Sequence, residues 1–401
     1  MDLGIIGGGA AGLFAACFAK RRDISFLVLE KTSSCGNKLL LTGGGRCNIL
    51  NLKSAAELKS CYHGKGNFLY PALAGFPPSE AYVFLEKELG LKLAEEENNR
   101  IFPASFKSRD VVDALTRDIG QDNIRLNFEV SSAELRPDGI WEVKSSAGDS
   151  LRFRNILLAA GGMSYPNTGS TGDSYRIASA AGHSLTETRA ALAPVKTEER
   201  SRISVPAGLT LKDCRLKLVD GDKVIRETTG DMLFTHDGLS GPAVMELARD
   251  IKKGQVLKAD LAPDLTDRVL LDQMDGHPAK RFVNVLAQYI PLSFAEYALA
   301  ASEADPRICC QAVNKTLRKA VLAVLKDFKI TAAADPDIRT AYVTAGGVDT
   351  DEVDRKTMES KTAKGLFLAG EVLDCDGISG GYNLTACIAQ AKLAVDSLRI
   401  V

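Results

Sequence analysis

Several features that define whole classes of protein are missing from this chain of 401 residues. It has no run of 18 or more apolar residues, so we expect no transmembrane helix and no membrane association. Its nine cysteines form no Cys-x-x-Cys pair, and with only four histidines no metal-ligand spacing appears, so we expect no bound metal. An odd number of cysteines without paired spacing indicates reduced thiols, which favours a cytoplasmic protein. The N-terminal residues also lack the charged start of a signal peptide.

An excess of one sign of charge is missing as well. The 50 basic and 51 acidic side chains leave a net charge of −1, so no overall field attracts nucleic acid or an anionic membrane. The hydrophobic share of 45% and the charged share of 25% are ordinary for a globular protein and exclude a disordered or collagen-like chain. The length of the chain favours two or three domains.

Glycine, in contrast, is concentrated in a few places. Of the 35 glycines, 17 fall in four short windows, which are residues 4–12, 36–45, 161–172 and 370–381. Glycine gathers where the backbone must approach a ligand closely or take a positive φ angle. The distribution therefore predicts that four loops share one large ligand.

The chain opens with a strand–turn–helix–strand pattern. Apolar residues predict strands over 2–6 and 24–30 on either side of a helix over 10–21, which is the start of a βαβ unit. Further strands are predicted over 124–129, 130–136, 140–145, 151–159, 215–219, 223–227 and 365–370, and further helices over 79–89, 108–119 (with Ser108 as its N-cap), 171–181 and 381–398.

The character of the chain changes near residue 185 and changes back near residue 341. Between these points, short alternating strands up to residue 260 are followed by helical periodicity over 266–330, where three prolines separate four short helices. We therefore predict an α/β fold in which both ends of the chain form one domain. The predicted boundaries are 1–188 plus 345–401 for a Rossmann-like domain, 189–264 plus 331–344 for a β-rich insert, and 265–330 for a helical insert.

The first glycine window fits the G-x-G-x-x-G pattern of dinucleotide-binding loops. Gly7 permits the tight turn after the strand, Gly9 lets the backbone approach a pyrophosphate, and Gly12 lets the helix pack closely. The pyrophosphate would lie at the N-terminus of the helix. Glu30, at the end of the second strand, would accept hydrogen bonds from ribose hydroxyls, and its charge would repel a 2′-phosphate. The pattern predicts NAD or FAD.

The other three windows favour one of these two ligands. The second window contains Gly44 and lies beside Lys38 and Arg46, so it offers backbone N–H groups and two cations to an anion. The third and fourth windows follow apolar strands at Gly161 and Gly370, where open α/β sheets place their ligands. One nucleotide needs one glycine loop. Four loops suit a longer ligand, which favours FAD.

These segments together resemble a known family. GIIGGGAAG, KLLLTGGGRCN, LLAAGGMSYPNTGSTGDSY, MLFTHDGLSGPAVMEL and GLFLAGEVLDCDGISGGYNLTACIAQA occur in this order, and along nearly its whole length the chain resembles the BaiN-like (YhiN-type) NAD(P)/FAD-dependent oxidoreductases. The resemblance implies an FAD/NAD(P)-binding Rossmann-like domain of the two-dinucleotide-binding type, with an inserted β-barrel-like module and a helical module. It also implies FAD as cofactor. NAD(P)H would act as a transient reductant, since no second G-x-G-x-x-G is present.

The resemblance also implies which residues hold the cofactor. Ala160 and Gly161 stand where the family usually has Thr-Gly, a change that removes a hydroxyl and leaves a backbone role intact. The implied contacts are Gly7, Gly9, Ala10, Ala11 and Gly12 for the pyrophosphate, Glu30 for the adenosine ribose, Lys31 and Lys38 along the adenosine and phosphates, Val130 for adenine, Gly370 and Glu371 for the ribityl chain, and Gly381, Asn383 and Leu384 for the isoalloxazine.

Four residues are candidates for a proton donor. Reduction of a C=C bond next to a carbonyl adds hydride to the β-carbon and a proton to the α-carbon, and a flavin supplies only the hydride. The candidates are Cys47, whose pKa the neighbouring Arg46 would lower, Tyr165 and Tyr382, which flank glycine windows, and His236 in the insert. For each of them the alternative is a plain packing or loop-bracing role.

We therefore predict an FAD-dependent oxidoreductase that reduces an enone-like C=C bond of a small molecule with NAD(P)H. Residues 38–65 carry five basic side chains against one acidic, and residues 277–330 carry eight against four, which keeps RNA as an alternative partner. Reduction of uracil to dihydrouracil in RNA is chemically the same step. The remaining alternatives are a non-catalytic flavin-binding protein and an NAD-only dehydrogenase. No obligate protein partner is evident.

Overall fold

The computed structural model describes residues 1–204 and 206–399, which form two compact units. Unit 1 comprises Met1–Arg189 and Tyr342–Val401, and unit 2 comprises Ala190–Ala341. The strands β11 (Arg189–Ala191) and β18 (Val343–Ala345) lie where the chain leaves unit 1 and re-enters it. Unit 1 is thus built from both ends of the chain. The finer division of the middle segment into a β-rich and a helical module stays a prediction.

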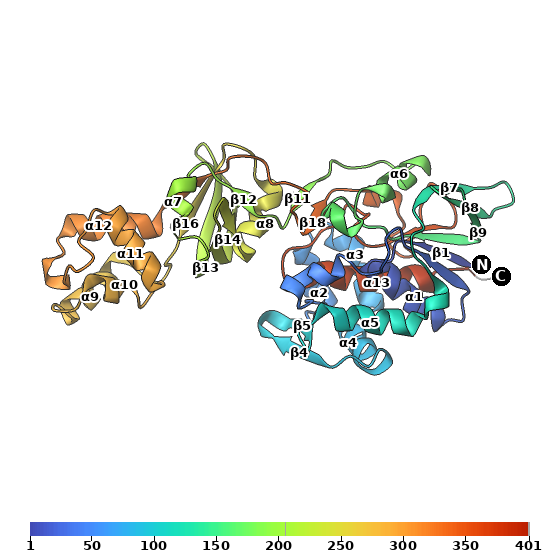
Figure 1. The fold of residues 1–401 in the computed structure, drawn as a ribbon, viewed down its shortest axis with the longest axis horizontal. Coiled ribbons are helices and arrows are strands. Elements are labelled where there is room, and N and C mark those ends of the chain that lie inside the picture. The colour runs from blue at the N-terminus through green and yellow to red at the C-terminus, as the bar shows by residue number, and fades with distance from the viewer. Residues whose placement is uncertain (205, 400–401) are drawn as a thin grey trace. The chain divides into compact units, whose positions relative to one another are not determined.

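A five-stranded sheet forms the centre of unit 1 (Figure 1). Its strand order is β19-β10-β1-β2-β6, and every neighbouring pair is parallel. All residues of β1 and β2 are buried, as expected for a parallel sheet that is covered on both faces. The strands are β1 (Leu3–Ile6), β2 (Phe26–Leu29), β6 (Ile124–Arg125), β10 (Asn155–Leu158) and β19 (Leu366–Leu368).

Two different layers cover the two faces of this sheet. Side chains alternate along β1, so Ile5 contacts helix α1 on one face while Gly4 meets the ring of Phe153 on the other. A Cβ atom at Gly4 would lie 2.7 Å from that ring, so glycine is required there for close packing. The helical layer is α1 (Ala10–Lys20), α5 (Ser108–Ile119) and α13 (Tyr382–Asp396), and the second layer is the antiparallel sheet of β7 (Val130–Leu135), β8 (Trp141–Ser145) and β9 (Ser150–Phe153).

The remaining elements of unit 1 are short. A three-stranded antiparallel sheet has the order β3-β5-β4. Its strands are β3 (Leu50–Asn51), β4 (Leu93–Glu96) and β5 (Arg100–Pro103), and the helices are the 3-10 helix η1 (Leu39–Gly45), α2 (Ala55–Leu58), α3 (Gly66–Gly75), α4 (Pro78–Val83) and α6 (Asp173–Ala180).

Three sequence-based expectations in unit 1 are wrong in detail. The strand expected over 151–159 is two strands, because residues up to Phe153 pair antiparallel with β8 while those from Asn155 pair parallel with β1. The helix expected over 79–89 is α4 followed by a short π-helical turn, Phe84–Glu88. Ser108 is the first residue of α5 and not its N-cap, because its hydroxyl donates instead to the carbonyl oxygen of Leu40, 2.8 Å away.

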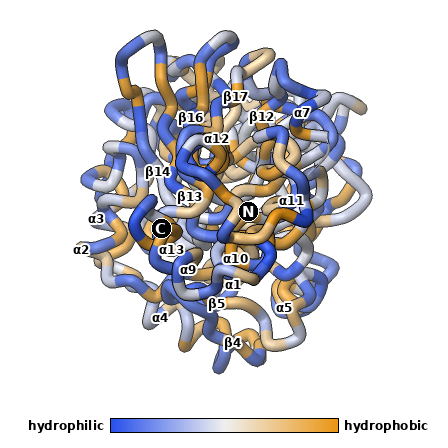
Figure 2. Tube along the Cα trace, turned by 90° about the vertical axis from the view of Figure 1, so that its left-hand side faces the viewer, coloured by the Kyte–Doolittle hydropathy of each residue, from blue (hydrophilic) through white to orange (hydrophobic). Residues whose placement is uncertain are grey.

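Unit 2 contains an antiparallel sheet that closes on itself. Its strand order is β12-β15-β14-β13-β16-β17, and a bridge between Thr197 and Ala332 joins the chain just beyond the two edge strands, as expected of a barrel-like module. Hydrophilic and hydrophobic residues are mixed along β13 and β14 (Figure 2). The strands are β12 (Val195–Lys196), β13 (Thr210–Asp220), β14 (Lys223–Phe234), β15 (Gly238–Ser240), β16 (Val256–Asp260) and β17 (Phe328–Thr331).

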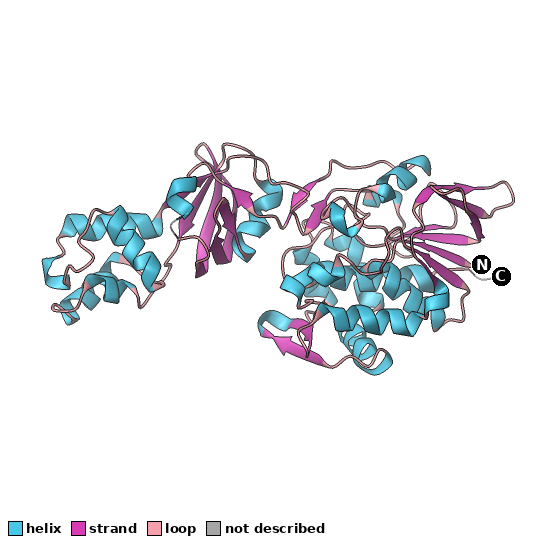
Figure 3. Ribbon diagram, in the orientation of Figure 1, coloured by secondary structure: helices cyan, strands magenta, loops and turns pink. Residues whose placement is uncertain are grey.

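The helices of unit 2 lie beside this sheet (Figure 3). Their buried apolar residues share one hydrophobic core with those of the sheet. Phe294 of α11 packs against Phe234 of β14, with ring centroids 5.5 Å apart, and against Phe328 of β17 at 6.1 Å. The four short helices expected over 266–330 are confirmed. The helices are α7 (Arg200–Ser204), α8 (Pro242–Leu247), α9 (Asp267–Gly276), α10 (Phe282–Leu286), α11 (Leu292–Ala301) and α12 (Lys315–Lys326). None of the helices in residues 1–204 and 206–399 has the length and apolar character that a membrane crossing requires.

The contact between Gly12 and Gly7 generates a prediction. A Cβ atom at Gly12 would lie 2.0 Å from the carbonyl oxygen of Gly7, so Gly12→Ala is expected to lower the free energy of unfolding by at least about 1–3 kcal/mol. Gly75→Ala is the matched control, because nothing lies within 4 Å of the added atom at the end of α3. The control is expected to be neutral or stabilising by up to about 1 kcal/mol. Urea denaturation measures both values, and equal stability of Gly12→Ala and the wild type would contradict the expectation.

Candidate functional site

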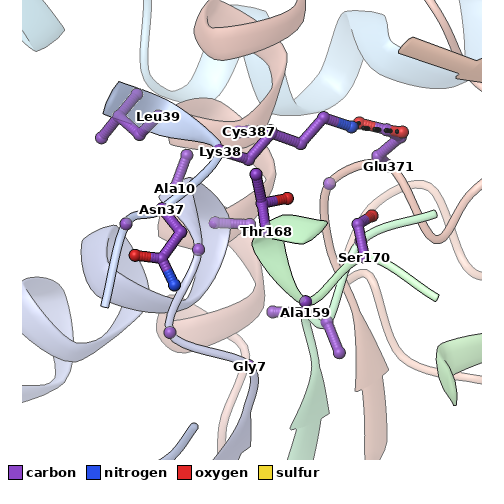
Figure 4. A pocket seen from close by; sticks show the side chains of 18 of the residues that line it. Gly7, Ala10, Asn37, Lys38, Leu39, Ala159, Thr168, Ser170, Glu371 and Cys387 are labelled. Atoms are coloured by element: carbon purple, nitrogen blue, oxygen red, sulfur yellow. Dashed lines mark hydrogen bonds and ion pairs between the residues drawn. The ribbon is translucent and has the colours of Figure 1, made fainter. Parts of the chain in front are cut away.

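A cleft that is partly open to solvent lies in unit 1 at the carboxyl ends of the central strands (Figure 4). The loops after β1, β2, β10 and β19 all contribute to its lining. The strand order reverses between β1 and β10, because β2 follows on one side of β1 and β10 pairs on the other. Open parallel sheets bind their ligands at such a reversal. The fold alone therefore points to this cleft as a ligand site.

The three glycines of the first loop are needed for different reasons. A Cβ atom at Gly7 would lie 2.6 Å from the Cα atom of Ala160, and one at Gly12 would collide with Gly7 itself. Both glycines are therefore required by the packing of the protein. A Cβ atom at Gly9 would meet nothing closer than the carbonyl oxygen of Ala159, 4.0 Å away. The protein leaves this space open, and it belongs to the cleft.

The N-terminus of α1 faces the cleft without a side-chain cap. Gly9 is its N-cap residue, and Gly9, Ala10 and Ala11 all line the cleft. The first N–H groups of a helix lack intrahelical partners, and the helix dipole makes this end positive. The start of α1 is consequently suited to bind an anion.

Glu30 is held in place at the end of β2. It is 9% exposed, and its carboxylate accepts hydrogen bonds from the N–H of Gly8 at 2.8 Å, the N–H of Thr32 at 2.8 Å and the hydroxyl of Thr32 at 2.7 Å. The next residue, Lys31, forms an ion pair with Asp173 of α6, with Nζ and Oδ2 2.6 Å apart. These contacts fix one carboxylate and one cation at the same end of the cleft.

Lys38 and Glu371 connect the second glycine window to the fourth. The Nζ of Lys38 lies 2.7 Å and 2.9 Å from the two carboxylate oxygens of Glu371, and 2.5 Å from the hydroxyl of Ser164 (Figure 4 draws the pair). Glu371 also accepts from the Ser164 hydroxyl at 2.9 Å and from the N–H of Thr344 at 2.9 Å. The side chains of Lys38 and Glu371 are 23% and 20% exposed. This network joins three loops that lie far apart in the sequence.

The fourth window is stabilised by side-chain amides. The amide of Asn383 accepts from the N–H of Gly377 at 2.8 Å and donates to its carbonyl oxygen at 3.0 Å. The N–H of Gly370 donates to the amide oxygen of Gln390 at 2.8 Å. These bonds fix the turn between β19 and α13, so the start of α13 is held against the cleft.

Fourteen of the eighteen residues predicted to bind the cofactor line the cleft. Their individual roles toward a cofactor stay predictions. The fourteen are Gly7, Gly9, Ala10, Ala11, Glu30, Lys31, Lys38, Val130, Ala160, Gly161, Gly370, Glu371, Asn383 and Leu384, whereas Gly12, Gly44, Arg46 and Gly381 are outside the lining.

Arg46 and Cys47 differ from expectation. The Arg46 guanidinium pairs with Glu96 at 3.0 Å and lies 4.7 Å from the ring centroid of Phe102, on the β3-β5-β4 sheet. Cys47 is 0% exposed, and burial raises the pKa of its thiol to about 12. The prediction that Arg46 lowers the pKa of Cys47 is therefore wrong. The two residues are adjacent in the chain, but the guanidinium of Arg46 lies against Glu96 and Phe102 while the thiol of Cys47 is buried.

The other three candidates for a proton donor have separate environments. Tyr165 packs edge-on against Tyr342, with centroids 5.3 Å apart, and burial raises its pKa to about 12. His236 is exposed in the loop between β14 and β15 of unit 2. Tyr382 is the first residue of α13, is 4% exposed, and accepts a hydrogen bond from Lys53. None of the four belongs to the lining of the described cleft.

Several residues of the site escaped the sequence interpretation. Ser164 belongs to a quoted segment and Thr344, on β18, lies outside all of them, but a single hydroxyl residue carries no distinctive pattern. Gln390 lies on the buried side of α13, and polar residues on an apolar helix face are the one signal that points to it. Tyr342 and Asp173 also line the cleft. Asp173 directly follows the third glycine window, and Tyr342 lies outside all four windows.

The ion pair of Lys38 and Glu371 is expected to contribute measurably to stability. Lys38→Met and Glu371→Gln each remove charge-assisted hydrogen bonds and should each lower the free energy of unfolding by about 1.5–3 kcal/mol. The double variant should lose less than the sum of the two, with a coupling energy of about 0.5–3 kcal/mol. Denaturation of the cofactor-free wild type, the two single variants and the double variant measures these losses. Additive losses in the double variant would show that the two side chains do not interact.

Cys47 is expected to be unreactive in the folded protein. With a pKa raised to about 12, the thiol is protonated at pH 8, and only the thiolate reacts with iodoacetamide. Mass spectrometry should find Cys47 unmodified in native protein and modified in urea. The partly exposed Cys309 provides an internal comparison. Modification of Cys47 in the native protein at a rate like that of Cys309 would contradict this.

Comparison with known proteins identifies relatives that match nearly the whole chain. The protein family described as HI0933-like protein Rossmann domain matches residues 1–397 of this chain. A ribosomal RNA dihydrouridine synthase of Escherichia coli K12 is 31% identical over 95% of this chain and 94% of its own length. A 3-dehydro-bile acid delta(4,6)-reductase of Clostridium scindens is 30% identical over 98% of this chain and 97% of its own.

A solved structure shows the same fold at low identity. The 3-ketosteroid delta1-dehydrogenase of Sterolibacterium denitrificans superposes with a TM-score of 0.52 at 13% identity, over 99% of both chains. The predicted Rossmann-type α/β fold is thereby confirmed. The predicted enzyme class, an FAD-dependent oxidoreductase, agrees with the matched family and its reductase relative. The chain therefore belongs to the family of HI0933-like proteins with a Rossmann domain.

Proposed function

We propose that the cleft binds FAD and that the protein uses it to reduce a C=C bond conjugated to a carbonyl in a small molecule. NAD(P)H serves as the reductant. The observation that carries the proposal is the open space at Gly9 between the start of α1 and the end of β10, in a chain that is 30% identical over nearly its whole length to a bile acid reductase.

The residues of the cleft fit FAD in three respects. The space at Gly9 lets a diphosphate reach the backbone, and the uncapped N-terminus of α1 supplies N–H donors and a positive dipole end. Glu30 stands where the hydroxyls of an adenosine ribose would need an acceptor. Lys31 and Lys38 add positive charge along the same wall. The cleft continues from these residues to the start of α13, which gives room for a second half of a long ligand.

The protein itself supplies binding, orientation and a proton. Bound flavin supplies hydride transfer. The Lys38–Glu371 network would keep the middle of the cleft rigid, because Glu371 is held by donors from three other segments of the chain. The start of α13 presents unpaired N–H groups to negative charge at the far end of the cleft. A reducing compartment such as the cytoplasm suits the nine cysteines, all of which are free thiols.

The two curated relatives have a common type of reaction. One is named as a delta(4,6)-reductase of 3-dehydro-bile acids and the other as a dihydrouridine synthase. A 3-keto steroid with ring double bonds and a uracil both contain a C=C bond conjugated to a carbonyl. The shared step supports the proposed reaction independently of the substrate.

The charges favour a small molecule over RNA. Unit 2 holds 22 basic and 21 acidic side chains, so it has almost no net charge. Acidic partners from elsewhere in the chain neutralise part of the two basic segments. The pairs are Lys38–Glu371, Arg46–Glu96, Lys65–Asp374, Arg318–Asp267 and Lys326–Asp260. RNA reduction is the second candidate, favoured by the 31% identity to the dihydrouridine synthase.

Two substitutions at Gly9 test the cofactor site. Gly9 has an extended backbone with φ −81°, which any residue adopts, and both Asp and Ser are good N-cap residues. Gly9→Asp places a carboxylate where the diphosphate would lie and is expected to weaken FAD binding at least about tenfold more than Gly9→Ser does. Flavin fluorescence titration measures the affinity, and denaturation of the cofactor-free proteins checks that stability is unchanged within about 1 kcal/mol. Equal FAD affinities of the two variants would show that FAD does not bind in this part of the cleft.

Anaerobic half-reactions test the activity. The flavin absorbance of the holoenzyme should bleach on mixing with NADH or NADPH and return on addition of a 3-keto steroid enone. If the colour returns with uracil-containing RNA and not with the enone, the second candidate function, reduction of uracil in RNA, is supported instead. A flavin that neither nucleotide bleaches would mean that the protein binds flavin without this catalysis.

A further inference from the structure

Ser170 lies in the wall of the cleft, on the segment that leads from β10 to α6 (Figure 4). Lys31, the residue after Glu30, holds this segment against the end of β2. Its Nζ lies 2.6 Å from the hydroxyl of Thr171 and 2.6 Å from the carboxylate of Asp173. Contacts of the residues that follow Ser170 therefore fix its position in the wall.

Two glycines show which part of the cleft Ser170 adjoins. A Cβ atom at the preceding residue, Gly169, would lie 3.9 Å from Oε1 of Glu30. The hydroxyl oxygen of Ser170 lies 3.3 Å from the position that a Cβ atom of Gly161 would take, and Gly161 lines the cleft shortly after β10, beside the first glycine loop. Ser170 is therefore close to both Glu30 and the first glycine loop, where the ADP half of FAD would bind.

The hydroxyl of Ser170 has no partner in the described part of the chain. Ser170 is 6% exposed, and within residues 1–204 and 206–399 its Oγ makes no hydrogen bond. Buried polar groups in proteins almost always have a partner, because leaving one unpaired costs free energy. Since no hydrogen bond holds this side chain in one rotamer, the hydroxyl can turn about the Cα–Cβ bond toward a ligand without losing a contact of that kind. The fold thus keeps an unused hydrogen-bonding group in the wall of the cleft.

We propose that the Ser170 hydroxyl forms a hydrogen bond with the ADP half of FAD. This inference rests on the proposed function and adds a cofactor-binding residue to it. A hydroxyl both donates and accepts hydrogen bonds, and the ADP half offers phosphate oxygens, ribose hydroxyls and adenine nitrogens as partners. The protein already shields this hydroxyl from water, so its bond to the ligand replaces no bond to water. Binding therefore gains more from Ser170 than from a hydroxyl that is exposed beforehand.

Ser170→Ala and Ser174→Ala test the proposal as a matched pair. Ser174, the second residue of α6, is 0% exposed, and its hydroxyl also lacks a partner among the described residues, but it is outside the lining of the cleft. Each substitution removes an unpaired buried hydroxyl, so neither should lower the urea midpoint of the cofactor-free protein. Only Ser170→Ala should weaken FAD binding, by at least about fivefold, as measured by flavin fluorescence titration.

Binding of ADP identifies the part of the cofactor that Ser170 contacts. Ser170→Ala should reduce the affinity for ADP, measured by calorimetry, by the same factor as the affinity for FAD. An FAD affinity that Ser170→Ala leaves unchanged, or that both variants lower equally, would overturn the inference, and so would a loss for FAD without a loss for ADP. A lowered urea midpoint of Ser170→Ala would also overturn it, because the hydroxyl would then serve the packing of the protein. A wild type that binds neither FAD nor ADP would instead overturn the proposed function itself.

Discussion

The meeting of three backbone segments at Gly7 is the constraint on which unit 1 depends. A side chain at Gly7 would overlap the end of β10, and one at Gly12 would overlap the loop that contains Gly7. Two strands and a helix can converge there only because neither glycine carries a Cβ atom. The floor of the cleft is consequently made of backbone. The side chains of Glu30, Lys38 and Glu371 line the cleft around this floor.

Much of this arrangement could be predicted from the sequence, because it depends on local patterns. The glycine spacing, the strand that precedes it and the acidic residue at the end of the next strand all lie within residues 2–30. These local patterns predict the structure well, because the geometry of the neighbouring backbone requires them and contacts with distant residues do not. The four short helices of unit 2 were predictable for a similar reason, because proline and helical periodicity act over a few residues.

What could not be predicted depends on contacts between distant residues. Ser164 and Thr344 are 180 residues apart, yet the Thr344 hydroxyl accepts from the N–H of Ser164 at 3.1 Å. Arg46 is next to Cys47 in sequence but turns its guanidinium to Glu96 and Phe102. Charge behaves in the same way. The basic segments stand out in the sequence, and the acids that neutralise them become visible only in the fold.

The construction of unit 1 from both chain ends has a consequence for its synthesis. Leu157 of β10 pairs with Phe367 of β19, 210 residues later in the chain. During translation, β1, β2 and β10 are present long before β19 and α13, so the β10 edge of the sheet stays open until β19 emerges. The wall of the cleft formed by Gly370 to Gln390 is completed only then. The nascent protein therefore lacks this wall of the cleft until β19 and α13 have emerged, and its exposed sheet edge is the part that chaperones would need to protect.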